Sequence, residues 1–118
     1  MNKARILLVG DDPTLLQTRA LILKDWETVS STSAEALSAV HSGSFDIIVV
    51  GQTVSVGMAT EIISTAKALN PPPHVIAIRF PDDESDLGVE THTTDLGAHP
   101  SWLRERVAFL LAKRSQTG

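Results

Sequence analysis

Short, continuous apolar runs alternate along the chain with segments whose apolar residues recur at helical spacing. Three of the runs, Ile6–Val9, Ile47–Val50 and Val75–Ile78, are rich in β-branched residues, and a weaker fourth lies around Thr28 and Val29. Runs of this kind are typical of strands that are buried on both faces in a parallel sheet. The pattern therefore predicts strands that alternate with helices.

Start and stop signals place the first two helices. Asp12-Pro13 predicts the start of a helix that runs to about Lys24, because aspartate caps free N–H groups and proline fits the first turn. Thr32 followed by Glu35 resembles a capping box at the start of a second helix, and Gly43 is a typical stop signal after it.

Two further helices are indicated by apolar stripes. The third helix is marked by Met58, Ile62, Ala66 and Leu69, and the last by Leu103, Val107, Leu110 and Leu111. Both sets repeat as one face of an amphipathic helix does, and the prolines at 71–73 end the third helix. The segment 81–97 has little periodicity, and it predicts only a short fourth helix near Asp83–Val89 and a fifth strand near Thr93–Leu96.

The order of these elements predicts an α/β fold of flavodoxin-like (βα)5 type, with a doubly wound, parallel, five-stranded sheet in the order 2-1-3-4-5. We expect a domain over residues 3–114 whose fourth helix can be short or irregular, followed by a frayed C-terminal end or a linker remnant at 115–118. Ligands of such sheets bind beyond the carboxyl ends of the strands, where the strand order reverses. That edge lies between the first and third strands, at residues 10–12 and 51–53.

Composition and charge disfavour several classes of function. The chain of 118 residues has 10 Lys and Arg against 14 Asp and Glu, and a net charge of −4 argues against direct binding to nucleic acid. The absence of cysteine removes disulfides, thiolate zinc sites and thiol nucleophiles, and the histidines show no metal-ligand spacing. We find no signal-peptide pattern and no apolar run near the ~20 residues that span a bilayer, so we expect a cytoplasmic protein without membrane contact.

Several segments in a fixed order resemble the receiver domains of response regulators in two-component (phosphorelay) signalling. These segments are Asp11-Asp12 before Pro13, Trp26-Glu27 with Ala36-Leu37, Phe45–Val50, Val75–Ile78 and His99-Pro100. The resemblance covers nearly the whole chain. It implies a signalling domain that is not an enzyme and whose partner is a protein: a histidine kinase, an effector domain or another receiver.

The chain departs from the receiver pattern at the site that the resemblance implies. The phosphoacceptor aspartate of the family stands five residues after the position of Asp46, and Gly51 occupies that place here. Of the five implied site positions, only the acidic pair Asp11 and Asp12 remains. The other departures, in place of a Ser or Thr, a small residue and a lysine, are Arg79, Phe80 and His99.

Glycine has no side chain, so Gly51 can be neither a phosphoryl nucleophile nor a metal ligand. We therefore expect no catalytic residue, and no cofactor beyond weak Mg²⁺ binding by Asp11 and Asp12. Three functions remain open. The chain is a phosphorylation-independent protein-interaction module, a receiver switch phosphorylated at a non-standard residue such as Thr53 or Ser55, or a flavodoxin-like domain that binds a small ligand.

Three more side chains have alternative interpretations. Arg79 either pairs with the acidic pair in place of a metal ion or points to solvent. His99 either acts as a pH-sensitive latch near these carboxylates or faces solvent before the last helix. Trp102 either anchors a partner or packs on the core. Phe80 lies in the same region, where the resemblance implies a dimer or effector face formed by the fourth helix, the fifth strand and the last helix.

Overall fold

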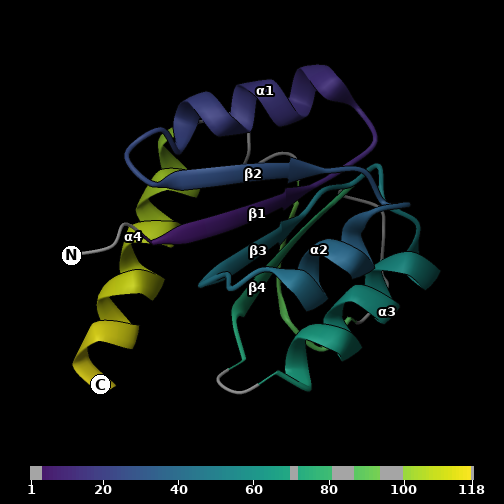
Figure 1. The fold of residues 1–118 in the computed structure, drawn as a ribbon. Coiled ribbons are helices and arrows are strands. Elements are labelled where there is room, and N and C mark those ends of the chain that lie inside the picture. Colours follow the sequence, from purple (N-terminus) through teal and green to yellow (C-terminus); the bar gives the residue numbers. More distant parts are fainter. Residues whose placement is uncertain (1–3, 70–71, 81–86, 94–99, 118) are drawn as a thin grey trace.

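The computed structural model describes residues 4–69, 72–80, 87–93 and 100–117, which include a five-stranded parallel sheet in the order β2-β1-β3-β4-β5 (Figure 1). The strands are β1 (Arg5–Val9), β2 (Glu27–Ser31), β3 (Ile47–Val50), β4 (His74–Arg79) and β5 (Glu90–Thr93). The predicted fold class and strand order are confirmed.

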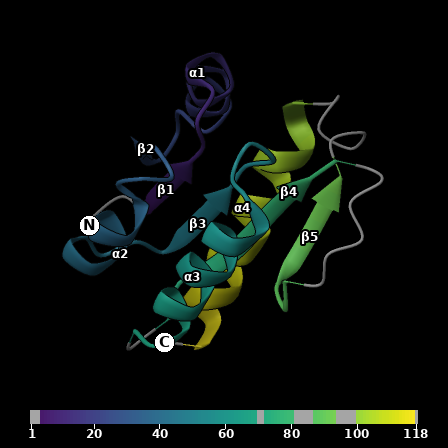
Figure 2. The ribbon, with the colours of Figure 1, turned by 90° about the vertical axis from the view of Figure 1, so that its right-hand side faces the viewer.

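Helices cover both faces of this sheet. In the described residues they are α1 (Pro13–Ile22), α2 (Ala36–Ser42), α3 (Val56–Lys67) and α4 (Pro100–Thr117). α1 and α4 lie on one face, whereas α2 and α3 lie on the other (Figure 1, Figure 2). The middle strands are therefore covered on both sides, which explains why the four residues of β3 are all apolar and buried.

Side chains alternate between two core clusters along each strand, as the pleat requires. The cluster under α1 and α4 includes Ile47, Val49, Ile76 and Ile78, and the cluster under α2 and α3 includes Ile48, Val50, Val75 and Ala77. The same alternation sets the direction of the side chains at the carboxyl ends of β3 and β4. A side chain at position 51 would point toward α1, whereas one at position 79 would point toward α3.

Main-chain hydrogen bonds align the carboxyl ends of three strands at one edge. The Gly10 amide donates to the Ser31 carbonyl at 3.0 Å, and the Gly51 amide donates to the Val9 carbonyl at 2.9 Å. Val9 is also paired in register with Val50. The loops after β1 and β3 therefore leave the sheet side by side, at the end where α1 begins (Figure 1). We call residues 10–12 and 51–53 the strand-end site.

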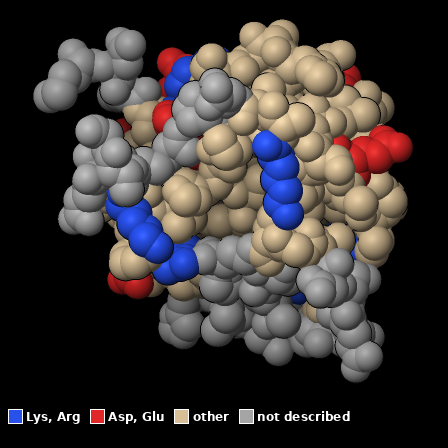
Figure 3. All heavy atoms as spheres, turned by 90° about the horizontal axis from the view of Figure 1, so that it is seen from below, with Lys and Arg blue, Asp and Glu red and all other residues tan. Residues whose placement is uncertain are grey.

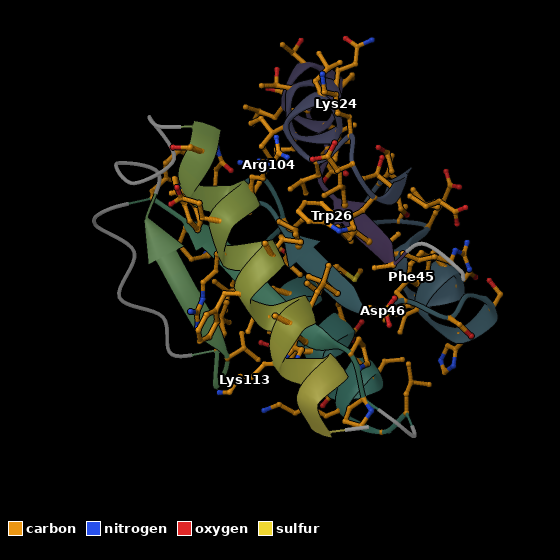
Figure 4. All side chains as sticks on the ribbon, turned by 90° about the vertical axis from the view of Figure 1, so that its left-hand side faces the viewer. Lys24, Trp26, Phe45, Asp46, Arg104 and Lys113 are labelled. Atoms are coloured by element: carbon orange, nitrogen blue, oxygen red, sulfur yellow. The ribbon has the colours of Figure 1, made fainter. Side chains whose placement is uncertain are left out.

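Polar contacts close the opposite, amino end of the sheet. Arg5 of β1 forms an ion pair with Glu27 of β2, and its guanidinium carbon lies 4.9 Å from the centre of the Phe45 ring. The Arg5 amide donates to the Asp46 carboxylate at 2.9 Å. Figure 4 shows Phe45 and Asp46 together just before β3. These contacts tie the starts of β1, β2 and β3 to one another, away from the strand-end site.

The predicted capping box of the second helix is wrong. α2 follows an N-cap at Glu35, whose side chain makes no capping hydrogen bond. Thr32 instead accepts the Glu35 amide through its main-chain oxygen at 3.2 Å, so the two residues form a turn before the helix. The predicted stop at Gly43 is confirmed as the C-cap.

Residues in the last third of the chain differ from the prediction. The fifth strand begins at Glu90 rather than near Thr93, because pairing with β4 selects its register despite a polar sequence. Residues 87–89 do not continue a fourth helix, and Gly88 has a φ of 71°, which a helix does not allow. Residues 83–86 and 94–96 of the two predictions lie outside the described residues. α4 continues to Thr117, so residues 115–117 belong to this helix.

Two features of the described residues bear on contact with membranes and nucleic acids. Across the described ranges, no helix combines the length and the apolar character that crossing a membrane requires. On the face seen in Figure 3, the basic and acidic side chains that are drawn in colour are scattered among uncharged residues. That face therefore presents no continuous basic surface among the residues described.

Candidate functional site

Asp12 lies at the start of α1 and serves as its N-cap. Its Oδ1 atom accepts hydrogen bonds from the amide of Thr14 at 2.9 Å and from the amide of Leu15 at 3.3 Å. Both amides belong to the first helical turn, which has no carbonyl partners within the helix. One of the two carboxylates of the acidic pair is therefore engaged in forming α1.

Asp11 is exposed, and its carboxylate is held by Ser33. Its Oδ1 accepts the Ser33 amide at 3.0 Å, and its Oδ2 accepts the Ser33 hydroxyl at 2.8 Å. The amide of Asp11 donates to Oγ1 of Thr53 at 2.9 Å. Asp11 thus connects the loops that follow β1, β2 and β3, which confirms that residues 10–12 and 51–53 meet.

Arg19 of α1 brings a guanidinium group to the strand-end site. It lies seven residues after Asp12, or about two helical turns. Long side chains of a helix lean toward its N-terminus, and the N-terminus of α1 is the end at the strand-end site. Nη2 of Arg19 donates to Oε1 of Gln52 at 2.7 Å, directly beside Gly51. The site therefore contains a cation supplied by the chain itself.

This guanidinium lies where a side chain of residue 51 would begin. A Cβ built on Gly51 would stand 2.6 Å from Nη1 of Arg19 and 3.1 Å from the carbonyl oxygen of Val9, and the first of these is an impossible separation. Gly51 does not have a positive φ, so its effect here comes from the space that it leaves for the guanidinium and not from backbone freedom. Any other residue at position 51 would force Arg19 to move.

The environment of Arg19 is less favourable to its charge than water is. Burial lowers the pKa of the Arg19 guanidinium, and the nearby negative charge of Asp12 raises it by less. The group still stays protonated at neutral pH, because the pKa of a guanidinium normally lies far above that range. The guanidinium therefore keeps its charge at this position, although burial disfavours that charge.

Arg79 does not take the role that either interpretation assigned to it. It is 5% exposed, so it does not point to solvent, and its Nη1 donates to the carbonyl oxygen of Val54 at 2.8 Å. Within the described residues, no ion pair joins Arg79 to Asp11 or Asp12, and the predicted pairing is wrong. Strand alternation gives the reason, since residue 79 continues the side of β4 that faces α3.

The remaining candidate residues lie apart from the acidic pair. Phe80 is 51% exposed at the end of β4, where it stands at the surface. Trp102 is half-buried and packs against the cluster under α1 and α4, as its core interpretation predicted. His99 lies outside the described residues, so its interpretations stay predictions.

The side chains present do not fit the divalent ion that the receiver resemblance implies. Mg²⁺ takes a near-octahedral set of carboxylate, carbonyl and water oxygens. Position 51 offers no carboxylate, and the cation of Arg19 stands beside it. Searching the described side chains finds no group of three His, Cys, Asp or Glu residues placed to hold a metal ion. The strand-end site thus contains the guanidinium of Arg19 and two aspartates whose carboxylates already accept hydrogen bonds within the chain.

Arg19 was not among the residues expected at the site, although α1 carries a signal for it. Leu16 and Ala20 pack against the cluster under α1 and α4, and Arg19 falls within the same helical stripe, three residues after Leu16. A charged residue in an apolar stripe has to be paired or to reach the surface with its head group. That signal identifies Arg19 as unusual, but it does not reveal the contact with Gln52.

The fold and the position of this site define a class: the chain has the fold of the CheY-like receiver domains of response regulators. It is similar to the CheY-like receiver domain protein of Methanospirillum hungatei JF-1, with a TM-score of 0.80 and 18% identity over 99% of this chain and 100% of that one. It is also similar to the signal receiver domain of a putative Luxo repressor protein of Vibrio parahaemolyticus, with a TM-score of 0.82 and 15% identity over 99% and 95%.

A third similar chain comes from a crystal structure of the histidine kinase ThkA in complex with the response regulator protein TrrA. Its TM-score is 0.68, with 23% identity over 92% of this chain and 98% of that one. No protein-family model matches the sequence, and no curated protein matches it. The likeness is therefore one of fold, over almost the full length of each chain.

Proposed function

We propose that the chain is a receiver-like protein-interaction module of two-component signalling, and that it acts without being phosphorylated. The observation that carries this proposal is Gly51 with the Arg19 guanidinium above it. Phosphoryl transfer to a receiver needs a nucleophile in line with the phosphoryl group and cations around its oxygens. Because position 51 has no nucleophile, the fold has only its surfaces left for signalling. In the same proposal the chain is cytoplasmic and is not an enzyme.

The proposed partner is a protein of the same signalling class, namely a histidine kinase, an effector domain or another receiver, including a second copy of this chain. A solved chain of the same fold belongs to a complex of a kinase with a response regulator, which supports a protein partner. Binding of a small ligand at the strand-end site is disfavoured, since Arg19 and the loop contacts of Asp11 already occupy that region.

The outer side of α4 is the surface that we propose for this contact. Phe109 is 53% exposed, and the charged groups of Arg106 and Lys113 lie 4.8 Å and 5.9 Å from the centre of its ring. Trp102, seven residues earlier in α4, packs on the core cluster under α1 and α4, so Phe109 is the aromatic residue of this surface. Aromatic and arginine side chains together are typical of the residues that dominate protein interfaces.

Intact mass measurement tests the absence of phosphorylation. The protein is incubated with a small phosphodonor and Mg²⁺, beside a receiver that has its acceptor aspartate as the positive control. We expect no species heavier by one phosphoryl group. A stable adduct would contradict the proposal, and fragment masses would then decide whether Thr53 or Ser55 of the loop after β3 carries it.

Sedimentation velocity tests the contact surface with the protein itself. If a second copy is the partner, Phe109→Ala should shift the association to higher protein concentration. Leu21→Ala is the matched control, because Leu21 is 70% exposed on α1. Equal effects of the two substitutions would remove α4 from the proposal. A wild-type protein that stays monomeric at every concentration would exclude a second copy as the partner. The same two variants would then be compared for binding to a kinase or an effector domain.

A further inference from the structure

We infer that Arg19 is the resident cation of the strand-end site, that it excludes a divalent metal ion from the acidic pair, and that Gly51 is the residue that gives it room. The inference goes beyond the proposed function, since it concerns what the site holds and not which partner the protein meets. It rests on the contacts of Arg19, on the space above Gly51 and on the charges around both.

Geometry makes the present position of Arg19 and a side chain at residue 51 mutually exclusive. The Cβ of any side chain would lie 2.6 Å from Nη1 of Arg19, and this nitrogen, at the end of a flexible side chain, would have to shift. Gln52, the next residue, holds the other terminal nitrogen at 2.7 Å. Gln52 is therefore a positioning residue, and Gly51 is the steric condition for the arrangement.

Charge makes the guanidinium and a divalent ion competitors. Asp11 and Asp12 are adjacent carboxylates, and such a pair favours a cation nearby. Arg19 supplies one positive charge that interacts with Asp12 and cannot dissociate from the chain. A metal ion at the same place would be repelled by this positive charge. It would also have one carboxylate ligand fewer than in a site with an aspartate at position 51.

The partly buried environment of the Arg19 charge agrees with a role of this residue in what the site binds. Burial lowers the pKa of the Arg19 guanidinium, so its charged form is less favoured here than in water. Residues that stand in an unfavourable environment are frequent at functional sites. Loss of the guanidinium should therefore change what the site binds more than it changes stability.

Three variants of the whole chain test the inference: Arg19→Met, Gly51→Asp and the two combined. The first readout is Mn²⁺-induced broadening of the amide signals of residues 10–12 and 51–53. We expect none in the wild type and selective broadening in Arg19→Met, where the acidic pair has lost its cation. The second is Mg²⁺ affinity by calorimetry. Gly51→Asp alone should bind Mg²⁺ weakly, because the new carboxylate meets Arg19, and the combined variant should bind at least about tenfold more tightly.

Arg104→Met is the matched control. Arg104 lies in α4 and pairs with Asp25, and both side chains are about half exposed. Asp25 follows the C-terminal end of α1, whereas the strand-end site adjoins its N-terminal end. This variant should respond to Mn²⁺ as the wild type does. Broadening at residues 10–12 in the wild type equal to that in Arg19→Met would overturn the inference.

Equal Mg²⁺ affinity of Gly51→Asp with and without Arg19 would also overturn the inference. If Gly51→Asp does not fold, the Mn²⁺ comparison of the wild type with Arg19→Met still decides. A phosphoryl adduct on the wild type would contradict the proposed function but not this inference, because neither metal-binding readout depends on phosphorylation.

Discussion

Removing the N-cap of α1 separates the structural role of Asp12 from the metal-binding role that the receiver resemblance implies. Asp12→Ala deletes two hydrogen bonds, to the amides of Thr14 and Leu15 at 2.9 Å and 3.3 Å. The helix has ten residues, none of them fully buried, so its first turn has little packing to replace the cap. We expect a loss of about 1 kcal/mol in the free energy of unfolding, within the ~0.5–2 kcal/mol of such caps.

Asp12→Asn keeps an oxygen at the capping position and removes only the charge. The remaining loss is that of a negative charge at a helix N-terminus, about 0.3–1 kcal/mol, and weaker repulsion from Asp11 offsets part of it. Asparagine should therefore cost clearly less than alanine. In melting temperature, the alanine variant should fall by roughly 4 °C for a chain of this length.

Urea unfolding followed by far-ultraviolet circular dichroism measures both variants, and an unchanged denaturant slope shows that the same transition is compared. Equal losses for asparagine and alanine would mean that the charge of Asp12, acting on Arg19, matters more than the cap. An unchanged alanine variant would show that α1 does not need the cap at all. Either result would refute the reasoning.

Three further predictions concern stability and use the same urea assay. Leu8→Ala, at a site with 0% exposure in β1, should cost about 3 kcal/mol, whereas Leu21→Ala, at 70% exposure, should change the free energy of unfolding by less than ~0.5 kcal/mol. Arg79→Ala should cost about 2 kcal/mol or more, since it empties a buried position and removes a charged donor from the Val54 carbonyl. Glu27→Gln should cost less than ~1 kcal/mol and lose that effect in high salt, because its ion pair with Arg5 is exposed.

The elements were predictable from the sequence where the signal is local. The apolar run Ile47–Val50 coincides with β3, and Asp12-Pro13 marks the start of α1 as observed. Capping and burial on both faces depend on residues that are near in the chain or on a pattern within one element. The prediction misplaced the start of β5, because Glu90–Thr93 is polar and becomes a strand through its pairing with β4.

The candidate site was predictable in part. Covalent order places residues 10–12 and 51–53 after two neighbouring strands, and the contact between Asp11 and Thr53 confirms that they meet. The choice of arginine was not predictable from spacing, because Arg79 is close to the site in the strand order whereas Arg19 is separated from Gly51 by two strands and a helix along the chain.

By itself, the sequence determined a parallel α/β sheet with an acidic pair after its first strand and no carboxylate directly after its third. These features depend on the order of residues along one chain. Tertiary structure alone decided that Arg19, and not Arg79, provides the cation beside the missing carboxylate. The physical reason is the pleat of the sheet: position 51 continues the side that faces α1, and position 79 continues the side that faces α3.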